Sequence, residues 1–201
     1  MPCYLGDYPR AAKNRDVKLL RAINSVVNQS FFDWELIIVA DGCEKTVKIV
    51  TDFLLSNKEY SGKIRGIHIN RKRAWSGYPR NTGIDKATGE VICYLDADDI
   101  LHPDHLQFIN KSFTYDLDWI WFDDLHPCGN EWKTNKCNIK HYGHCGTSNI
   151  AHLKRLPVQW PQVAGYSHDD YGFIRQLRNF KGAYAGAGMY QVCHIPGEYD
   201  Y

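Results

Sequence analysis

Apolar positions along this chain follow two alternating spacings, one typical of helices and one typical of buried strands. From Asp16 to Gln29 they recur every three or four residues, which predicts an amphipathic helix. Trp34 to Val39 is an unbroken apolar run of strand length that ends at the turn signal Asp41-Gly42. The further predicted helices are Glu44 to Leu55, Arg80 to Ala87, Pro103 to Phe113 and Asp169 to Phe180, and the further predicted strands are Ile64 to Ile69, Glu90 to Leu95 and Asp118 to Phe122.

This alternation of helices and strands predicts an α/β fold. Its central sheet is expected to be mostly parallel, with helices on both faces in the Rossmann-like manner. Sheets of this kind bind ligands at the carboxyl ends of their strands. We therefore expect the functional residues where predicted strands end. The length of 201 residues favours a single domain.

The most informative strand end carries three carboxylates within four positions. The apolar run from Val91 to Leu95 leads directly into Asp96, Asp98 and Asp99. Hard divalent cations such as Mn²⁺ and Mg²⁺ prefer carboxylate oxygens and keep coordination positions open for water and phosphate. A divalent metal site is one interpretation, and an acidic turn before the helix that starts near Pro103 is the alternative.

Charge, cysteine content and hydropathy limit the function classes. The 24 lysines and arginines nearly balance the 23 acidic residues and are spread along the chain, so the sequence indicates no nucleic-acid partner. No apolar run is long enough for a membrane span. The seven cysteines form no C-x-x-C pair and are odd in number, which indicates reduced thiols and a cytoplasmic location.

Between Leu125 and Tyr166 the periodicity is lost, which predicts a long functional loop. Its histidines and cysteines do not have the spacing of paired zinc ligands, so lining a ligand site is the favoured interpretation. The histidines and cysteines are His126, Cys128, Cys137, His141, His144 and Cys145, and aromatic residues that could stack on a ligand are Trp132, Tyr142, Trp160 and Tyr166.

Several motifs in sequence order resemble family 2 glycosyltransferases of the GT-A fold. They are Pro2-Cys3-Tyr4 for P-x-Y, residues 22–30 followed by 34–39 for A-I-x-S-V-x-x-Q-x and W-E-L-I-I-V, Ala40-Asp41-Gly42-Cys43 for D-D-G-S, Pro79-Arg80-Asn81-Thr82-Gly83 for A-R-N-x-G, and residues 94–99 for F-L-D-A-D-D. The resemblance covers nearly the whole chain. It implies one GT-A domain over residues 1–201, with a nucleotide-binding part at 1–99 and an acceptor and catalytic part at 100–201.

The resemblance implies a nucleotide-sugar donor, expected to be a UDP-sugar, and Mn²⁺ or Mg²⁺ as cofactor. A divalent cation would neutralise the diphosphate that leaves. The implied metal site consists of Asp98, Asp96 and Asp99, joined by His194 in Tyr190-Gln191-Val192-Cys193-His194, which resembles a closing Y-R-x-H with the spacing changed by one residue. The implied donor-binding residues are Pro2, Tyr4, Asp41, Arg80, Asp96 and Asp98.

The resemblance also implies a catalytic carboxylate at the start of the last predicted helix. Asp170 stands where the family carries its general base, and Asp169 stands beside it in place of a glutamate. Such a base would take the proton from a hydroxyl of a glycan or glycoconjugate acceptor, which favours inverting transfer over retaining transfer. A plain helix start with acidic residues is the alternative for this pair.

Two other function classes share features with this interpretation. A sugar nucleotidyltransferase would need a glycine-rich, lysine-containing phosphate loop, and residues 5–10 are a poor match to one. A non-catalytic nucleotide-sugar-binding module would bind donor without turnover. One departure from the family concerns its first strand, which is expected before Pro2, next to the strand that ends at Asp41. Its absence would leave backbone groups of the sheet unpaired.

Overall fold

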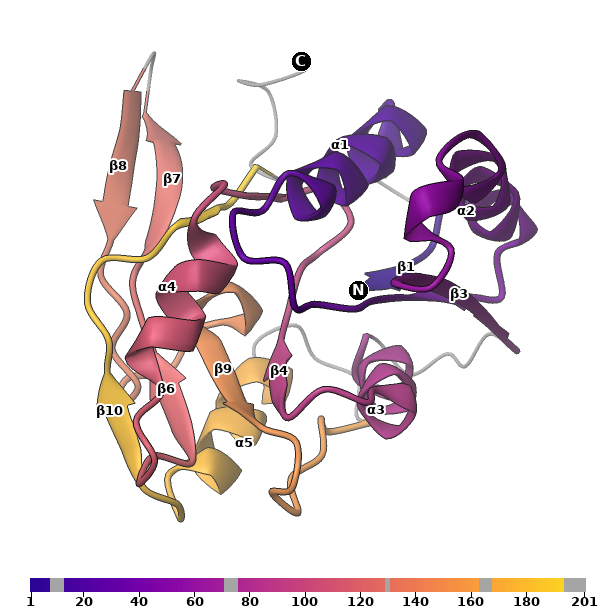
Figure 1. The fold of residues 1–201 in the computed structure, drawn as a ribbon. Helices are drawn as coiled ribbons and strands as arrows, with labels where there is room; N and C mark the ends of the chain where they lie inside the picture. The colour runs from indigo at the N-terminus through magenta and orange to yellow at the C-terminus, as the bar shows by residue number, and fades with distance from the viewer. Residues whose placement is uncertain (8–12, 71–75, 129–130, 163–167, 194–201) are drawn as a thin grey trace.

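The computed structural model describes residues 1–7, 13–70, 76–128, 131–162 and 168–193 (Figure 1). The helices are α1 (Arg15–Val27), α2 (Glu44–Ser56), α3 (Gly77–Lys86), α4 (His105–Ser112) and α5 (His168–Leu177). The strands are β1 (Pro2–Cys3), β2 (Leu36–Asp41), β3 (Ile64–Ile69), β4 (Val91–Cys93), β5 (Ile100–Leu101), β6 (Trp119–Trp121), β7 (Asp124–Cys128), β8 (Glu131–Asn135), β9 (Ile150–Leu153), β10 (Gly182–Tyr184) and β11 (Tyr190–Gln191).

The first half of the chain forms the parallel sheet that the sequence predicts. Its strand order is β1-β2-β3, and every pair is parallel. Helices α1 and α2 lie on one side of this sheet and α3 on the other (Figure 1). The alternation along β2 explains this, because Leu36 and Ile38 join the cluster that contains α1 residues, whereas Ile37 and Val39 join a second cluster with α5 residues.

In the second half, antiparallel pairing mixes with parallel pairing. One sheet has the order β10-β6-β9-β4, with β9 antiparallel to both β6 and β4, and another has the order β5-β11-β7-β8. Strand β6 presents Trp119 to the core that contains α5, and Ile120 to the core that contains Ile109 of α4. Helices α4 and α5 therefore cover opposite faces of β6, and the α/β class is confirmed as a mixed-sheet architecture.

The segment from Leu125 to Tyr166 is not the structureless loop that its lost periodicity predicts. It contains most of the antiparallel hairpin β7-β8 and the strand β9. Strand β8 is exposed at all five positions and β9 is buried at its first three, so neither shows the alternation that marks a half-buried strand. Pro127 within β7 also argues against a strand in the sequence. The structure tolerates it because β7 belongs to a hairpin that projects from the body (Figure 1).

The place of the first strand is partly filled by β1. Pro2 pairs with Val39 and Cys3 with Ala40, and the backbone nitrogen of Met1 donates to the carbonyl of Ile37 at 2.9 Å. The backbone of β2 is therefore paired on the side where its groups would otherwise be buried unsatisfied. Within the described ranges, no helix has both the length and the apolar character needed to cross a membrane.

Candidate active site

Arg80 is the centre of the candidate site, and helix α3 positions it. Pro79 fits the first turn of α3, where its missing N–H has no intrahelical acceptor, and Arg80 points inward from the next position. Its Nη2 donates to Oδ1 of Asp96 at 3.0 Å and its Nη1 to Oγ of Ser76 at 2.5 Å. Its guanidinium carbon lies 4.6 Å from the ring centroid of Trp160. The side chain is thus held by a fork of donors and by an aromatic face.

Two carboxylates stabilise the charge of this buried arginine. Burial opposes the charged form, but Asp96 and then Asp170 favour it, and the pKa of Arg80 is raised above its ordinary value. Asp96 lies after β4 and Asp170 in α5, so elements from three parts of the chain meet here. The sequence-based expectation that Arg80 and Asp96 share a site agrees with this geometry.

The loop that carries Asp96 and Asp98 is fixed through its backbone. The hydroxyl of Tyr190 accepts a hydrogen bond from the Asp96 nitrogen at 3.0 Å, and Nη2 of Arg21 donates to the Asp98 carbonyl at 2.6 Å. The side chain of Asp96 is 33% exposed, which leaves part of its carboxylate accessible. The loop therefore presents carboxylate oxygen to solvent from a rigid backbone.

Asp99, by contrast, is 1% exposed. Its Oδ2 accepts from the Tyr190 hydroxyl at 2.8 Å, and its Oδ1 accepts from the backbone nitrogen of Cys193 at 2.6 Å. Burial, with the nearby Asp99 and Asp96 carboxylates, raises the pKa of Tyr190, which keeps its hydroxyl protonated as a donor. Asp99 thus ties the segment after β11 to the acidic loop.

A pocket of about 290 Å³ brings several predicted residues together. Its lining includes Arg80, Asp96, Asp99 and Asp170. Asp170 is half-buried, and its Oδ1 accepts from the hydroxyl of Thr147 at 3.3 Å. Asp169 lies in helix α5, but its side chain is outside the described residues, as is the whole of His194.

Two of the expected donor-binding residues, Tyr4 and Asp41, lie at the end of β2 and beside it. The ladder between β1 and β2 ends one residue before Tyr4 and Asp41. Arg15 holds the segment that follows β1, donating to the carbonyl oxygens of Tyr4 and Gly6, each at 2.9 Å. The ring of Tyr4 lies over Gly6, where a Cβ would come within 2.3 Å of the Tyr4 hydroxyl oxygen. Pro2, Tyr4, Asp41 and Asp98 are not among the described residues that line the pocket.

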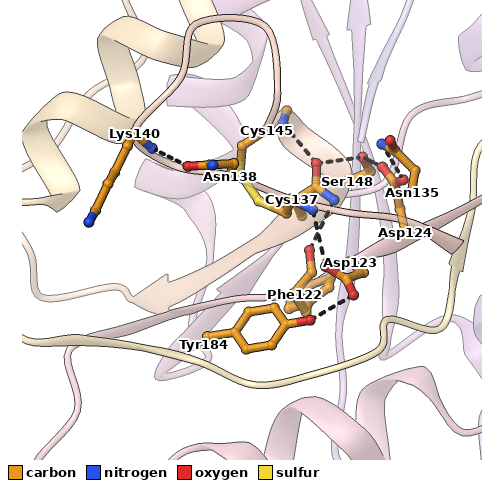
Figure 2. The surroundings of a disulfide bond; sticks show 12 residues. Phe122, Asp123, Asp124, Asn135, Cys137, Asn138, Lys140, Cys145, Ser148 and Tyr184 are labelled. Atoms are coloured by element: carbon orange, nitrogen blue, oxygen red, sulfur yellow. Dashed lines mark hydrogen bonds between the residues drawn. A yellow bond between two sulfur atoms is a disulfide. The ribbon is translucent and has the colours of Figure 1, made fainter.

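The same pocket has a second polar cluster that the sequence interpretation missed. Asp124, at the start of β7, is 2% exposed and accepts from Nδ2 of Asn135 at 3.0 Å and from Oγ of Ser148 at 2.7 Å. The Nε2 atom of His126 lies 3.1 Å from its Oδ1. Figure 2 shows Asn135 and Ser148 converging on Asp124. The available signal was that Asp123-Asp124 follows a predicted strand, as Asp96 does.

A disulfide between Cys137 and Cys145 corrects the prediction that all cysteines are reduced thiols (Figure 2). The backbone between them turns back on itself, with the Asn138 nitrogen donating to the His144 carbonyl at 3.0 Å. The two Cα atoms are therefore 4.9 Å apart, within bonding reach. The other five cysteines are free. The sequence spacing alone does not reveal this turn.

No group of three or more histidine, cysteine, aspartate or glutamate side chains converges as a metal site within the described part of the chain. Asp96 and Asp98 fit a cation that takes its remaining ligands from water and phosphate, as Mg²⁺ commonly does. The metal assignments of Asp96, Asp98, Asp99 and His194 stay predictions.

Comparison with known proteins gives a consistent family assignment. A model described as glycosyl transferase family 2 matches residues 11–171. A 96-residue stretch, 48% of this chain, is 32% identical to the amylovoran biosynthesis glycosyltransferase AmsB of Erwinia amylovora and covers 31% of that protein. A 99-residue stretch, 47% of this chain, is 33% identical to the poly(ribitol-phosphate) beta-N-acetylglucosaminyltransferase TarP of Staphylococcus aureus and covers 28% of it. The chain thus spans about a third or less of these relatives.

Solved structures show the same fold at low sequence identity. The mannosyltransferase PcManGT of Pyrobaculum calidifontis, in complex with GDP-Man and Mn²⁺, has a TM-score of 0.70 at 12% identity, with 98% of this chain and 56% of that chain covered. The S. aureus TarS fragment in complex with UDP-GlcNAc has a TM-score of 0.67 at 16% identity, with 98% and 58% covered. The GT-A fold is therefore confirmed.

Proposed function

Because the chain belongs to glycosyl transferase family 2, we propose that it moves a sugar from a nucleotide-sugar donor to a hydroxyl group of a glycan or glycoconjugate. The observation that carries this proposal is the meeting of Arg80, Asp96 and Asp170 at one pocket. A donor diphosphate needs cationic groups and an acceptor hydroxyl needs a base, and these residues supply both kinds of group. A UDP-sugar is the proposed donor, as in the TarS complex with UDP-GlcNAc.

We assign the donor-binding part of the site to Asp96, Asp98 and Arg80. We assign contacts with the nucleobase of the donor to Pro2, Tyr4 and Asp41. Mn²⁺ or Mg²⁺, when bound, would neutralise negative charge on the leaving diphosphate. The complex of PcManGT with Mn²⁺ supports a divalent metal. Arg80 orients the donor through its fixed guanidinium, and Asp99 acts as a positioning residue for the acidic loop because both of its oxygens already accept hydrogen bonds. His194 completes the proposed set.

We assign the base to Asp170, with Asp169 beside it. Asp170 lines the pocket close enough to stabilise Arg80, so an acceptor hydroxyl entering the pocket reaches both groups. The carboxylate takes the hydroxyl proton while the oxygen attacks the anomeric carbon from the face opposite the leaving diphosphate, which inverts the configuration. The transferred group is proposed to be a hexosyl or deoxyhexosyl unit.

The domain division follows the sequence-based expectation as a proposal. Residues 1–201 would act as one GT-A domain, with donor-binding residues concentrated in 1–99 and acceptor-binding residues in 100–201. A cytoplasmic location was inferred from reduced thiols, and the disulfide removes that support, because such bonds are rare in the cytosol. Alkylation of Cys137 and Cys145 in rapidly quenched cells tests the location, since a cytoplasmic protein would carry both as thiols.

Thermal melting with a panel of nucleotide sugars tests the proposed function. At a donor concentration 100 times Kd, binding should stabilise the protein by about 2.7 kcal/mol and raise Tm by roughly 5–11 °C. The shift should require Mn²⁺ or Mg²⁺ and disappear in Asp98→Ala. Asp52→Ala, an exposed substitution in α2, is the matched control and should keep the full shift.

A metal-independent shift, or a full shift in Asp98→Ala, would refute the donor-site assignment. Donor binding without any release of nucleoside diphosphate would instead identify the chain as a non-catalytic nucleotide-sugar-binding module. The same samples analysed for released nucleoside diphosphate separate these outcomes.

A further inference from the structure

The second polar cluster of the pocket is built around one buried carboxylate, that of Asp124. Asp124 is 2% exposed, and His126, Asn135 and Ser148 surround it and line the same pocket. Asn135 comes from β8, and Ser148 lies in the short helical turn at Thr147–Asn149. Three separate segments thus direct polar atoms to one place. Burying polar groups costs desolvation free energy, which a bound ligand would help to offset.

The hydrogen-bonding capacity of this cluster matches vicinal hydroxyl groups. A carboxylate accepts from hydroxyls at several lone-pair positions. On Asp124, Oδ1 already faces Asn135 and His126, whereas Oδ2 accepts from Ser148 and keeps a further position for a ligand hydroxyl. The Ser148 hydroxyl donates to Asp124 and keeps lone pairs to accept from a ligand. A sugar hydroxyl is both donor and acceptor, so a pair of adjacent hydroxyls can use both groups at once.

The charges of the pocket argue against an anionic group beside this cluster. Among the described residues, its lining contains four carboxylates, those of Asp96, Asp99, Asp124 and Asp170, and one permanent cation, Arg80, which already pairs with Asp96. Lys136, in the segment after β8, pairs with Asp123 and is not among the described lining residues. A phosphate placed beside Asp124 would therefore meet like charge.

We propose that Asp124, His126, Asn135 and Ser148 form the acceptor subsite, and that it selects an uncharged sugar unit with vicinal hydroxyls over a phosphorylated one. The inference rests on the proposed function, because it names the acceptor class of that same pocket. Asp124 accepts hydrogen bonds from the acceptor hydroxyls and holds the sugar. Asp170, which accepts from Thr147 next to Ser148, takes the proton of the reacting hydroxyl. The position of Cys145 in the lining places the disulfide-closed segment 137–145 beside this subsite.

Direct binding of simple glycosides, without donor, tests this subsite. The probes are methyl glucoside, methyl galactoside, methyl N-acetylglucosaminide and their 6-phosphates, titrated at pH 7.5 by saturation-transfer NMR. At least one neutral glycoside should bind the wild type, and its 6-phosphate should bind at least tenfold more weakly. Asp124→Asn should weaken binding of the neutral glycoside by roughly 10–100-fold, the contribution expected of hydrogen bonds to a charged acceptor. It should also reduce the difference in affinity between the neutral glycoside and its 6-phosphate.

Ser148→Ala provides a second variant in case Asp124→Asn does not fold, because it keeps the carboxylate and removes one ligand-facing hydroxyl. It should weaken the neutral glycoside about two- to tenfold. Asp116→Asn is the control, since Asp116 is exposed and pairs with Lys181 away from the pocket. It should bind both probes as the wild type does.

Equal binding of neutral and phosphorylated probes, binding of none of them, or unchanged binding by both variants would overturn the proposal. Calorimetric titration of UDP, run in parallel with Mn²⁺, keeps the two hypotheses separate. UDP affinity should change less than twofold in Asp124→Asn. A wild type that binds no UDP would refute the proposed function, whereas the glycoside titrations still decide the sugar subsite.

Discussion

Replacing Asp99 tests whether its carboxylate has a structural role or binds the metal. Asp99→Ala removes the acceptor of two hydrogen bonds, from the Tyr190 hydroxyl at 2.8 Å and the Cys193 nitrogen at 2.6 Å, and leaves both donors buried. Each unsatisfied donor costs about 1–3 kcal/mol. Because removing a buried charge recovers part of its desolvation cost, we expect a net loss of about 2–4 kcal/mol in unfolding free energy.

Asp99→Asn should lower the unfolding free energy by about half as much as Asp99→Ala. Its amide oxygen still accepts from Tyr190, whereas its NH₂ group faces the N–H donor of Cys193. Urea unfolding followed by circular dichroism measures both variants, and Tm should fall by roughly 4–16 °C for Asp99→Ala. Asp98→Ala is the contrasting variant, expected to keep its stability and lose metal-dependent donor binding. Wild-type stability in Asp99→Ala together with lost donor binding would refute the positioning role and favour direct ligation.

Three further expectations concern other parts of the molecule. Replacing Cys137 and Cys145 by serine should lower the unfolding free energy by about 2.5 kcal/mol, from the entropy of the short closed loop, and wild-type stability under oxidising conditions would contradict this. Burial lowers the pKa of His152 to about 4, below its unfolded value of 6.5, so the unfolded state binds more protons and stability should fall between pH 6.5 and 4 by up to about 1.4 kcal/mol per pH unit. That slope should flatten in His152→Gln in acid-titrated denaturation curves. Asp170→Asn should keep donor affinity but reduce turnover roughly 10²–10⁴-fold, and near-normal turnover would leave this residue as a helix-start acid.

The spacing of apolar residues was sufficient to predict an element where one of its faces is buried. Ile64–Ile69 matches its predicted strand at both ends, and Glu44–Ser56 differs from its predicted helix by one residue. In contrast, β8 is exposed throughout and β9 is nearly buried throughout, so no period distinguishes either from a loop. The hairpin depends on cross-strand hydrogen bonds, which leave no trace in apolar spacing.

The residues of the candidate site were predictable singly but not in their pairing. A strand that ends in carboxylates identifies Asp96, and the motif around Arg80 identifies the arginine. The stacking of Arg80 on Trp160 and the bond from Tyr190 to Asp99 join positions 80 and 91 residues apart in the chain. These contacts depend on how the sheets pack. Asp124 carried the same strand-end signal as Asp96, but it lay outside the motifs of the resemblance.

Product analysis of the complete reaction is the most direct test of the central claim that this pocket transfers a sugar from a nucleotide-sugar donor. Purified protein is incubated with Mn²⁺, a panel of UDP-sugars and a neutral methyl glycoside, and the products are identified by mass spectrometry and NMR. We predict a disaccharide with inverted anomeric configuration and equimolar UDP, and neither product with Asp98→Ala. Formation of UTP and a sugar phosphate on addition of pyrophosphate, or binding of every donor without a disaccharide, would contradict the claim.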